Sequence, residues 1–188
     1  MSGLWVLVCG PSGAGKDSVM NWAAAHLADR PRIVFSRRVV TRPSHGSSDH
    51  DEVTTEQFAQ MSAGTGLAWQ WEAHGFQYGI ESRYALPVAA GQVVVVNGSR
   101  EHVGALGVAE NVRVVQIVAH ADHLASRLAQ RGRDAPHEVS QRLARNVHFS
   151  TLRVDHTIVN QGALADAGRQ LADYLVACIR REDSARVE

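Results

Sequence analysis

The amino-acid sequence predicts a three-layer α/β domain with a central parallel β-sheet. An apolar run over residues 4–9 is followed by a glycine-rich loop and then by a helical pattern that reaches Leu27. The continuous β-branched run at residues 93–96 is typical of a strand that is covered on both faces. A second buried run, residues 112–118, is again followed by a helical pattern. Strands that alternate with helices in this way favour a parallel sheet.

The loop after the first strand carries the strongest motif in the chain. Its residues are Gly10, Pro11, Ser12, Gly13, Ala14, Gly15, Lys16, Asp17 and Ser18. The spacing G-x-x-x-x-G-K matches a phosphate-binding loop, in which backbone N–H groups turn toward phosphate oxygens at a helix N-terminus. The alternative is a glycine-rich turn with a solvated lysine.

Lys16 stands out because it is the only lysine among the 19 basic residues of the chain. A compact ammonium fits between phosphate groups where a planar guanidinium does not. We therefore expect Lys16 to contact the β- and γ-phosphates of a nucleotide. The next residue is Asp17, where the motif usually has a Ser or Thr that binds magnesium, and a hydroxyl follows only at Ser18. This departure leaves the magnesium ligands open.

Length and composition limit the possible classes of protein. With 188 residues, 45% of them hydrophobic, the chain is long enough for one well-buried domain. Its formal net charge of zero argues against nonspecific binding to nucleic acid or membranes. Cys9 and Cys178 both occupy apolar positions, as reduced thiols of a cytosolic protein do. The lack of a signal-peptide pattern and of a long apolar segment predicts a cytoplasmic protein.

The segment after the first helix is expected to contain a polar binding loop. Pro31 breaks the helical pattern, and residues 33–35 form a short strand. Residues 36–50 are dense in Arg, Ser and His and show no helical period, so we expect a loop whose arginines bind an anion. A solvated surface loop is the alternative. Thr54 then opens a short helix with a capping-box pattern.

Residues 67–84 are rich in aromatic side chains. The spacing of Trp69, Trp71, Phe76 and Tyr78 suggests small antiparallel strands, interrupted by glycines. Together with the preceding arginine-rich loop, these strands would form a lobe of about residues 37–91, inserted between the parallel strands. Aromatic residues at such positions are more often core than ligand contacts.

Polar residues follow the strand at 93–96 and include Asn97 and Arg100. Because ligands bind at the carboxyl ends of parallel strands, these residues should face the same crevice as the phosphate loop. Two helical patterns after residue 118 carry an arginine cluster, formed by Arg127, Arg131, Arg133, Arg142 and Arg145. We expect a lid of about residues 122–150 that closes on a nucleotide, with a solvated helix face as the alternative.

The last part of the chain is expected to complete the sheet. Residues 156–160 form a strand, and a helix follows from residue 163 to about 181. Its inward-facing residues are expected to be Leu164, Leu171, Leu175 and Ile179. Residues 182–188 are expected to fray.

Several segments resemble the guanylate kinase family. They are the phosphate loop, Thr41-Arg42, the turn Gly75-Phe76-Gln77-Tyr78-Gly79 and the arginine-rich lid. The chain looks closer still to the ribose 1,5-bisphosphate phosphokinases of bacterial phosphonate breakdown. Three segments favour this second family: Gly-Lys-Asp-Ser in the loop, Val-Asn-Gly-Ser-Arg after the central strand and Arg-Gly-Arg in the lid. The resemblance covers about residues 3–178 and implies a P-loop kinase with an acceptor-binding lobe and a helical lid.

Departures from the guanylate kinase pattern support this choice. The second arginine of that family's Thr-Arg-x-x-Arg pair is absent, since His45 stands there. The positions that read guanine in that family hold Gln70, Ile80 and Asn97 here. Each of these replacements removes a polar partner that a buried guanine would need. Guanylate is therefore a poor acceptor candidate.

The resemblance implies phosphoryl transfer from ATP to the 1-phosphate of ribose 1,5-bisphosphate, which gives 5-phosphoribosyl 1-diphosphate (PRPP) and ADP. Residues 10–18 would bind the ATP phosphates, and the residues implied in catalysis are Lys16, Arg131, Arg133 and Arg142. The sugar bisphosphate would be bound by Arg38, Arg42, His50, Tyr78, Asn97 and Arg100. Asp17 and Ser18 would hold Mg²⁺, with Asn97 as a further oxygen donor. The competing interpretation is that Asp17 only favours the first helical turn by its charge.

Two other functions stay open. One is a guanylate kinase or other nucleoside monophosphate kinase with unusual base selection. The other is a catalytically silent guanylate-kinase-like interaction domain, against which the intact Lys16 and lid arginines argue. We expect a small sugar phosphate as the substrate of a monomer or homodimer, and no nucleic-acid or membrane partner.

Overall fold

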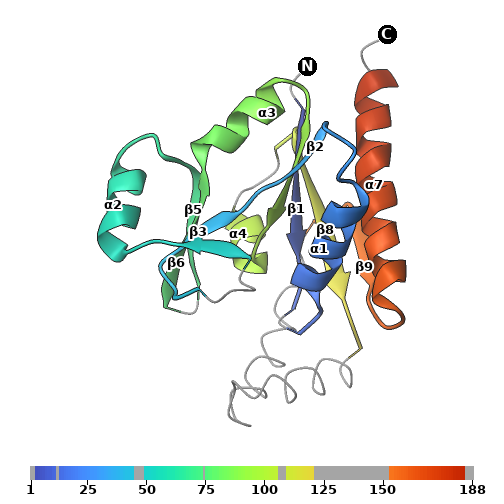
Figure 1. Ribbon diagram of the computed structural model, residues 1–188, viewed down its shortest axis with the longest axis horizontal. Helices are drawn as coiled ribbons and strands as arrows, with labels where there is room; N and C mark the ends of the chain where they lie inside the picture. The colour runs from blue at the N-terminus through green and yellow to red at the C-terminus, as the bar shows by residue number, and fades with distance from the viewer. Residues whose placement is uncertain are drawn as a thin grey trace.

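A five-stranded parallel β-sheet forms the centre of the structure (Figure 1). The structure is a computed structural model that describes residues 3–11, 13–44, 49–73, 75–105, 109–120 and 153–184. The strand order is β2-β7-β1-β8-β9. The strands are β1 (Leu4–Cys9), β2 (Ile33–Phe35), β7 (Val93–Asn97), β8 (Val112–Val118) and β9 (His156–Val159). All five were predicted, and the predicted α/β class with a parallel sheet is confirmed.

The inner strands explain the continuous apolar runs of the sequence. Every residue of β1 and of β7 is buried, because both faces of the sheet are covered and no position is left for an alternating polar residue. The register places Asn97 of β7 beside Val8 of β1. The polar end of β7 therefore lies next to the loop that begins at Gly10.

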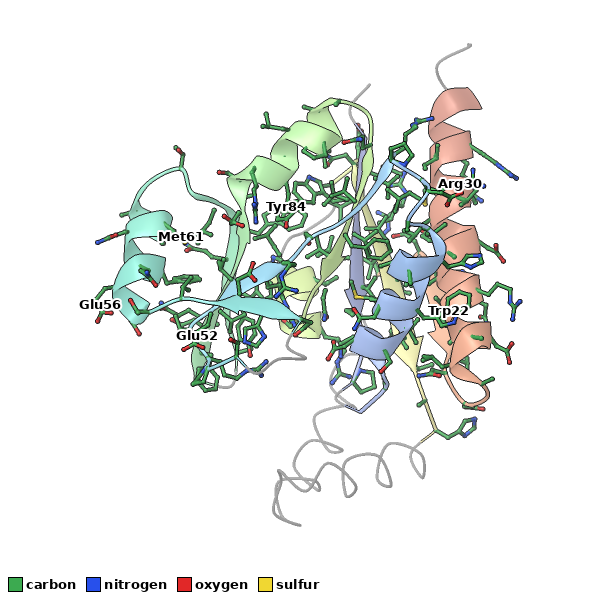
Figure 2. All side chains as sticks on the ribbon, in the orientation of Figure 1. Trp22, Arg30, Glu52, Glu56, Met61 and Tyr84 are labelled. Atoms are coloured by element: carbon green, nitrogen blue, oxygen red, sulfur yellow. The ribbon has the colours of Figure 1, made fainter. Side chains whose placement is uncertain are left out.

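Two helices, α1 (Lys16–His26) and α7 (Leu164–Ser184), pack against each other over one face of the sheet (Figure 1). Gly168 of α7 permits their close approach, because a Cβ atom there would lie 2.3 Å from Cε3 of Trp22. Figure 2 shows the Trp22 side chain between the two helices. The aromatic ring thus takes the space that a larger residue at position 168 would need.

The inward face of α7 was predicted correctly in part. Leu171 and Leu175 are fully buried, and Ile179 packs at the edge of the same core. Leu164, however, is 41% exposed, because it is the first residue of the helix and precedes the part that reaches the sheet. The helix also continues to Ser184, so the prediction that fraying begins at residue 182 was wrong.

A second sheet, in the order β4-β3-β6-β5, lies beside the central sheet on the side away from α7 (Figure 1). Its strands are β3 (Arg38–Val40), β4 (His50–Glu52), β5 (Leu67–Ala73) and β6 (Phe76–Glu81). The antiparallel pairing of β5 with β6 was predicted. The stretch 36–50 was expected to be a loop, but it contains β3 and the first residue of β4. Strands of three residues are too short to show an alternating pattern.

The helix α2 (Thr55–Ala63) begins with the predicted capping box. The Thr54 hydroxyl accepts a hydrogen bond from the Gln57 backbone N–H at 3.1 Å, and the Gln57 side chain accepts one from the Thr54 N–H at 2.8 Å. Two N–H groups of the first turn are thereby satisfied. Phe58 is buried and anchors this helix.

The opposite face of the central sheet is covered by the second sheet and by short helical segments, η1 (Ser82–Tyr84), α3 (Ala85–Ala89) and α4 (Arg100–Ala105). These segments were not predicted, because six residues or fewer show less than two turns of periodicity. Trp69 packs here against Trp5, with ring centroids 4.4 Å apart. This agrees with the expectation that most aromatic residues of the lobe are core.

His102 of α4 is buried in this aromatic core. Its ring stacks on Trp71 with centroids 4.2 Å apart, and its Nδ1 has no hydrogen-bond partner among the described residues. Burial lowers the pKa of His102 from its usual 6.5 to about 4. The folded protein therefore favours the neutral ring.

We expect this histidine to make the folded state sensitive to acid. The contribution of the neutral His102 ring to the free energy of unfolding is complete above pH 6.5. It is lost as the pH falls toward 4, because the unfolded chain binds the proton first. The shift from 6.5 to about 4 corresponds to roughly 3 kcal/mol. Between pH 7 and pH 4, the melting temperature of His102→Phe, which keeps an aromatic ring, should fall less than that of the wild type.

The matched control is His26→Phe, because His26 is exposed and also stacks on a tryptophan, Trp22, at 4.8 Å. This control should decline with pH as the wild type does. A His102→Phe variant with an unchanged pH profile would contradict the assignment.

Cys9 and Cys178 are both buried and unpaired, as predicted. None of the helices in the described ranges has the length and apolarity needed to cross a membrane. The predicted lid of about residues 122–150 lies outside the described residues.

Candidate active site

The phosphate loop connects the end of β1 to the start of α1 and follows an unusual backbone path. Gly10 has φ 147°, and a Cβ atom there would lie 2.0 Å from the backbone oxygen of Ile117. Gly15 caps α1 in the left-handed region, with φ 82°. Asn160, the residue that follows β9, donates a hydrogen bond from Nδ2 to the Ala14 carbonyl at 2.8 Å. Glycines thus permit the loop path, and the end of β9 holds it in place.

Lys16 folds back over this loop. Its Nζ donates hydrogen bonds to the carbonyl oxygens of Gly10 at 2.9 Å and Pro11 at 3.3 Å. Burial lowers the pKa of the ammonium, and the neighbouring Asp17 carboxylate opposes this effect. Arg38 and Arg100 also lie close enough to lower the pKa. The ammonium therefore lies near two further cations as well as a carboxylate, and an anionic ligand would stabilise its charged form.

A polar pocket lies between the phosphate loop and the second sheet. Its cavity volume is about 150 Å³. The residues that line it are Gly13, Gly15, Lys16, Asp17, Arg38, Arg42, Asp49, Tyr78 and Asn97. The pocket thus joins a loop suited to nucleotide phosphates with cations from the lobe that the sequence predicted to bind an acceptor.

The pairing of β3 with β6 places Arg38 and Tyr78 on the same side of the second sheet. Val40 lies opposite Tyr78 in the register, and Arg38 is two residues before Val40, so all three share one face. The Arg38 guanidinium lies over the Tyr78 ring, 5.7 Å from its centroid. Tyr78 stacks in turn on Trp71. The aromatic packing therefore holds the arginine toward the pocket.

His50 lies behind the lining residues and is 2% exposed. Its Nδ1 lies 3.5 Å from Arg42 Nη2, and its Nε2 lies 3.3 Å from the Arg42 carbonyl oxygen. Nδ1 also lies 3.4 Å from Asp49 Oδ1. His50 thus contacts two lining residues without lining the pocket itself.

Asn97, at the end of β7, links the two sides of the pocket. Its Nδ2 donates hydrogen bonds to Asp17 Oδ1 at 2.8 Å and to Asp49 Oδ2 at 2.7 Å. Its Oδ1 is buried and has no hydrogen-bond partner among the described residues. One amide group therefore orients a carboxylate of the phosphate loop and a carboxylate of the lobe.

Asp49 was not predicted as a site residue. Its Oδ2 also accepts a hydrogen bond from the Arg38 guanidinium. Burial alone would raise the pKa of the Asp49 carboxyl, but the charge of Arg38 and the hydrogen bond from His50 hold it below its usual value. The sequence signal was a carboxylate close to Asp51 and Glu52, at the end of a stretch rich in arginine. Only the fold, however, shows that position 49 meets position 97.

The structure brings together many of the residues selected from the sequence. Lys16, Asp17, Arg38, Arg42, Tyr78 and Asn97 line one pocket. Arg100 begins α4 and is near enough to Lys16 to affect its pKa. Ser18 is exposed and is not among the lining residues. Ser12, Arg131, Arg133 and Arg142 lie outside the described residues.

Comparison with known proteins gives a consistent picture. No protein-family model matches the chain. The chain is 42% identical over 173 residues to a ribose 1,5-bisphosphate phosphokinase of Agrobacterium fabrum, covering 90% of this chain and 94% of that protein. It is 43% identical over 179 residues to the protein of the same name from Methylobacterium radiotolerans, covering 95% and 100% of the two chains.

The fold has a solved counterpart in guanylate kinase from Anaplasma phagocytophilum. The TM-score is 0.73 at 18% sequence identity, and the match covers 94% of this chain and 86% of that one. This similarity confirms the guanylate-kinase-like fold. The sequence similarity to the named relatives extends over nearly the whole chain, so the chain belongs to the ribose 1,5-bisphosphate phosphokinase family.

Proposed function

We propose that this chain transfers the γ-phosphoryl group of ATP to the 1-phosphate of ribose 1,5-bisphosphate, giving PRPP and ADP, in phosphonate degradation. The observation that carries the proposal is the pocket in which the phosphate-loop lysine, Arg38 of β3 and Arg42 just after β3 line one cavity. Such a pocket suits an acceptor with high negative charge, and a bisphosphate is one. The relatives are named ribose 1,5-bisphosphate phosphokinases, which supports the proposal.

The chemistry requires positioning and positive charge rather than a strong base. An oxygen of the acceptor 1-phosphate forms the new bond to the γ-phosphorus, and the bridging oxygen leaves with ADP. The attacking oxygen is already anionic, so no proton has to be removed from it. Lys16 stabilises the charge on the transferred group, while Arg38 and Arg42 bind acceptor phosphate oxygens. The Tyr78 hydroxyl group donates a hydrogen bond to the same acceptor phosphate.

The oxygen donors beside Lys16 fit a magnesium ion. Asp17 supplies a carboxylate, and the Asn97 Oδ1 atom is a buried acceptor without a partner in the described part of the chain. Magnesium prefers such oxygens and is usually held by few protein groups together with phosphate and water. We assign Asp17 as its carboxylate ligand, directly or through water, with Asn97 or Ser18 as neutral donors. When bound, magnesium would neutralise charge on the ATP phosphates.

Further parts of the proposal rest on the sequence. Arg131, Arg133 and Arg142 are assigned to a lid that neutralises the transition state and excludes water. The protein is proposed to act in the cytoplasm on a small sugar phosphate, as a monomer or homodimer. His50 and Arg100 are assigned to the acceptor through the lining residues that they adjoin.

A nucleoside monophosphate kinase is the second candidate, because the fold is that of a guanylate kinase. The positions that would read a base do not favour it. Gln70 is exposed, Ile80 is fully buried, and the Asn97 amide nitrogen is engaged by two carboxylates. Gln70 lies at the surface and Ile80 is apolar, so neither offers a polar partner to a buried base, and the free Oδ1 atom of Asn97 is assigned to magnesium.

The test is an ADP-release assay with ribose 1,5-bisphosphate, GMP, AMP and gluconate as acceptors. We expect ribose 1,5-bisphosphate to have a kcat/KM at least about 10²-fold above that of GMP, because a base without polar partners is rejected. Comparable values for the two acceptors would instead support the nucleoside monophosphate kinase.

A further inference from the structure

Asp49 is, with Asp17, one of two carboxylates in a pocket that also holds cations suited to phosphate. It lines the cavity together with Lys16, Arg38 and Arg42. A phosphate group gains energy from the cations, but a carboxylate at similar distance repels it. A carboxylate also accepts hydrogen bonds and donates none. Asp49 therefore suits a hydrogen-bond donor of the ligand rather than its phosphates.

The contacts of Asp49 fix the carboxylate and leave room for one more donor. Its Oδ2 accepts from Arg38 and from Asn97 Nδ2, whereas its Oδ1 is approached only by His50 Nδ1, at 3.4 Å, among the described residues. An ionised carboxylate has about four acceptor positions. The side chain is 18% exposed. At least one acceptor position is thus open to a ligand in the pocket.

The hydrogen-bond network connects Asp49 to the phosphate loop, where the proposed function would bring the reacting phosphate. Asn97 Nδ2 bridges Asp49 and Asp17, and Asp17 directly follows Lys16 in the phosphate loop. Asp49 is therefore separated from the phosphate loop by one side chain. In ribose 1,5-bisphosphate the accepting phosphate is on C1, and the nearest hydroxyl group is on C2. That hydroxyl is the donor closest to the reacting phosphate.

We propose that Asp49 accepts a hydrogen bond from the 2-hydroxyl group of the acceptor sugar and makes the enzyme selective for ribose over 2-deoxyribose phosphates. The inference rests on the proposed function, which brings the 1-phosphate to this end of the pocket. Arg38 and Asn97 hold the carboxylate in position before the sugar arrives. A 2-deoxy sugar leaves this acceptor unpaired, and buried unpaired polar groups are what make a site discriminate.

The test compares kcat/KM for ribose 1,5-bisphosphate and 2-deoxyribose 1,5-bisphosphate. We expect the wild type to prefer the ribose substrate by about tenfold or more, the usual effect of a hydrogen bond to a charged group. The preference should shrink in Asp49→Asn, which keeps the shape and a weaker acceptor, and should vanish in Asp49→Ala. Asp51→Asn makes the same charge change at a half-exposed carboxylate that pairs with Arg37, and it should keep the wild-type preference.

Two alternative roles of Asp49 predict other results. If Asp49 only positions Arg38, both variants lose activity equally on the two sugars, and the inference is overturned. If Asp49 holds magnesium, the variants need more magnesium while the sugar preference is unchanged, which also overturns it. A thermal unfolding measurement on Asp49→Asn verifies that this variant is folded before its kcat/KM values are compared with those of the wild type.

A binding measurement separates this inference from the proposed function. Ribose 5-phosphate and 2-deoxyribose 5-phosphate are titrated calorimetrically into the protein without ATP. A preference for ribose 5-phosphate that depends on Asp49, in a protein that does not phosphorylate ribose 1,5-bisphosphate, would support the inference and reject the proposed function. Normal turnover of ribose 1,5-bisphosphate with an unchanged sugar preference in Asp49→Ala would reject the inference alone.

Discussion

Substitution of Lys16 by methionine is expected to lower kcat by at least about 10²-fold, because the ammonium stabilises charge that grows in the transition state. Lys16 lies in the pocket beside Asp17 and near Arg38, and its Nζ is held by the carbonyls of Gly10 and Pro11. Methionine keeps the length of the side chain without the charge. Steady-state kinetics should show a larger effect on kcat than on the KM for ATP.

The chain offers a direct control for this prediction. Lys16 is the only lysine, so amine-directed labelling should modify only this side chain and the α-amino group, and ATP should protect the former. Arg30→Met removes an exposed cation that pairs with Asp29 and should leave kcat unchanged. A folded Lys16→Met variant with near-normal activity would refute the role assigned to the loop lysine.

Substitution of Asp17 by asparagine should raise the magnesium concentration for half-maximal rate by about tenfold or more. The reason is that a neutral amide binds magnesium far more weakly than a carboxylate. The hydrogen bond from Asn97 to Asp17 Oδ1 positions the carboxylate beside Lys16, so the variant also tests this orientation. Binding of Mn²⁺ to the ATP complex, measured by electron paramagnetic resonance, gives a readout that does not depend on turnover.

The competing role of Asp17 predicts a different outcome. As an acidic residue in the first turn of α1, it would stabilise the helix by about 0.3–1 kcal/mol. Asp17→Asn would then lower the melting temperature of the metal-free protein and keep its magnesium dependence. Asp29→Asn, at an exposed surface carboxylate, is the control and should change neither property.

The sequence predicted the parts of the fold that depend on local patterns. The five parallel strands contain short apolar runs that alternate with helical patterns, and Thr54 and Gln57 mark the start of α2. The short strands β3 and β4 were missed because they form only through pairing with residues distant in the chain. The exposure of Leu164 was missed because a helical period does not show where the helix meets the sheet.

The same distinction applies to the candidate site. The phosphate loop could be predicted because its spacing is local. Arg38 could be predicted because it lies in a cationic stretch, and Asn97 because it lies at a strand end. Asp49 could not, since its partners are a residue on β3 and one on β7, which only the tertiary structure brings together. The close packing of Gly168 on Trp22 was invisible for the same reason.

The central claim is that the 1-phosphate of ribose 1,5-bisphosphate accepts the γ-phosphoryl group, and ³¹P nuclear magnetic resonance of the reaction mixture tests it most directly. With ATP, magnesium and ribose 1,5-bisphosphate, the single C1 phosphate signal should be replaced by two phosphorus signals coupled through a new P–O–P bond. The 5-phosphate signal should stay, and ADP should appear in equal amount. An unchanged sugar bisphosphate, with ADP formed only alongside inorganic phosphate or when GMP is converted to GDP, would contradict the account.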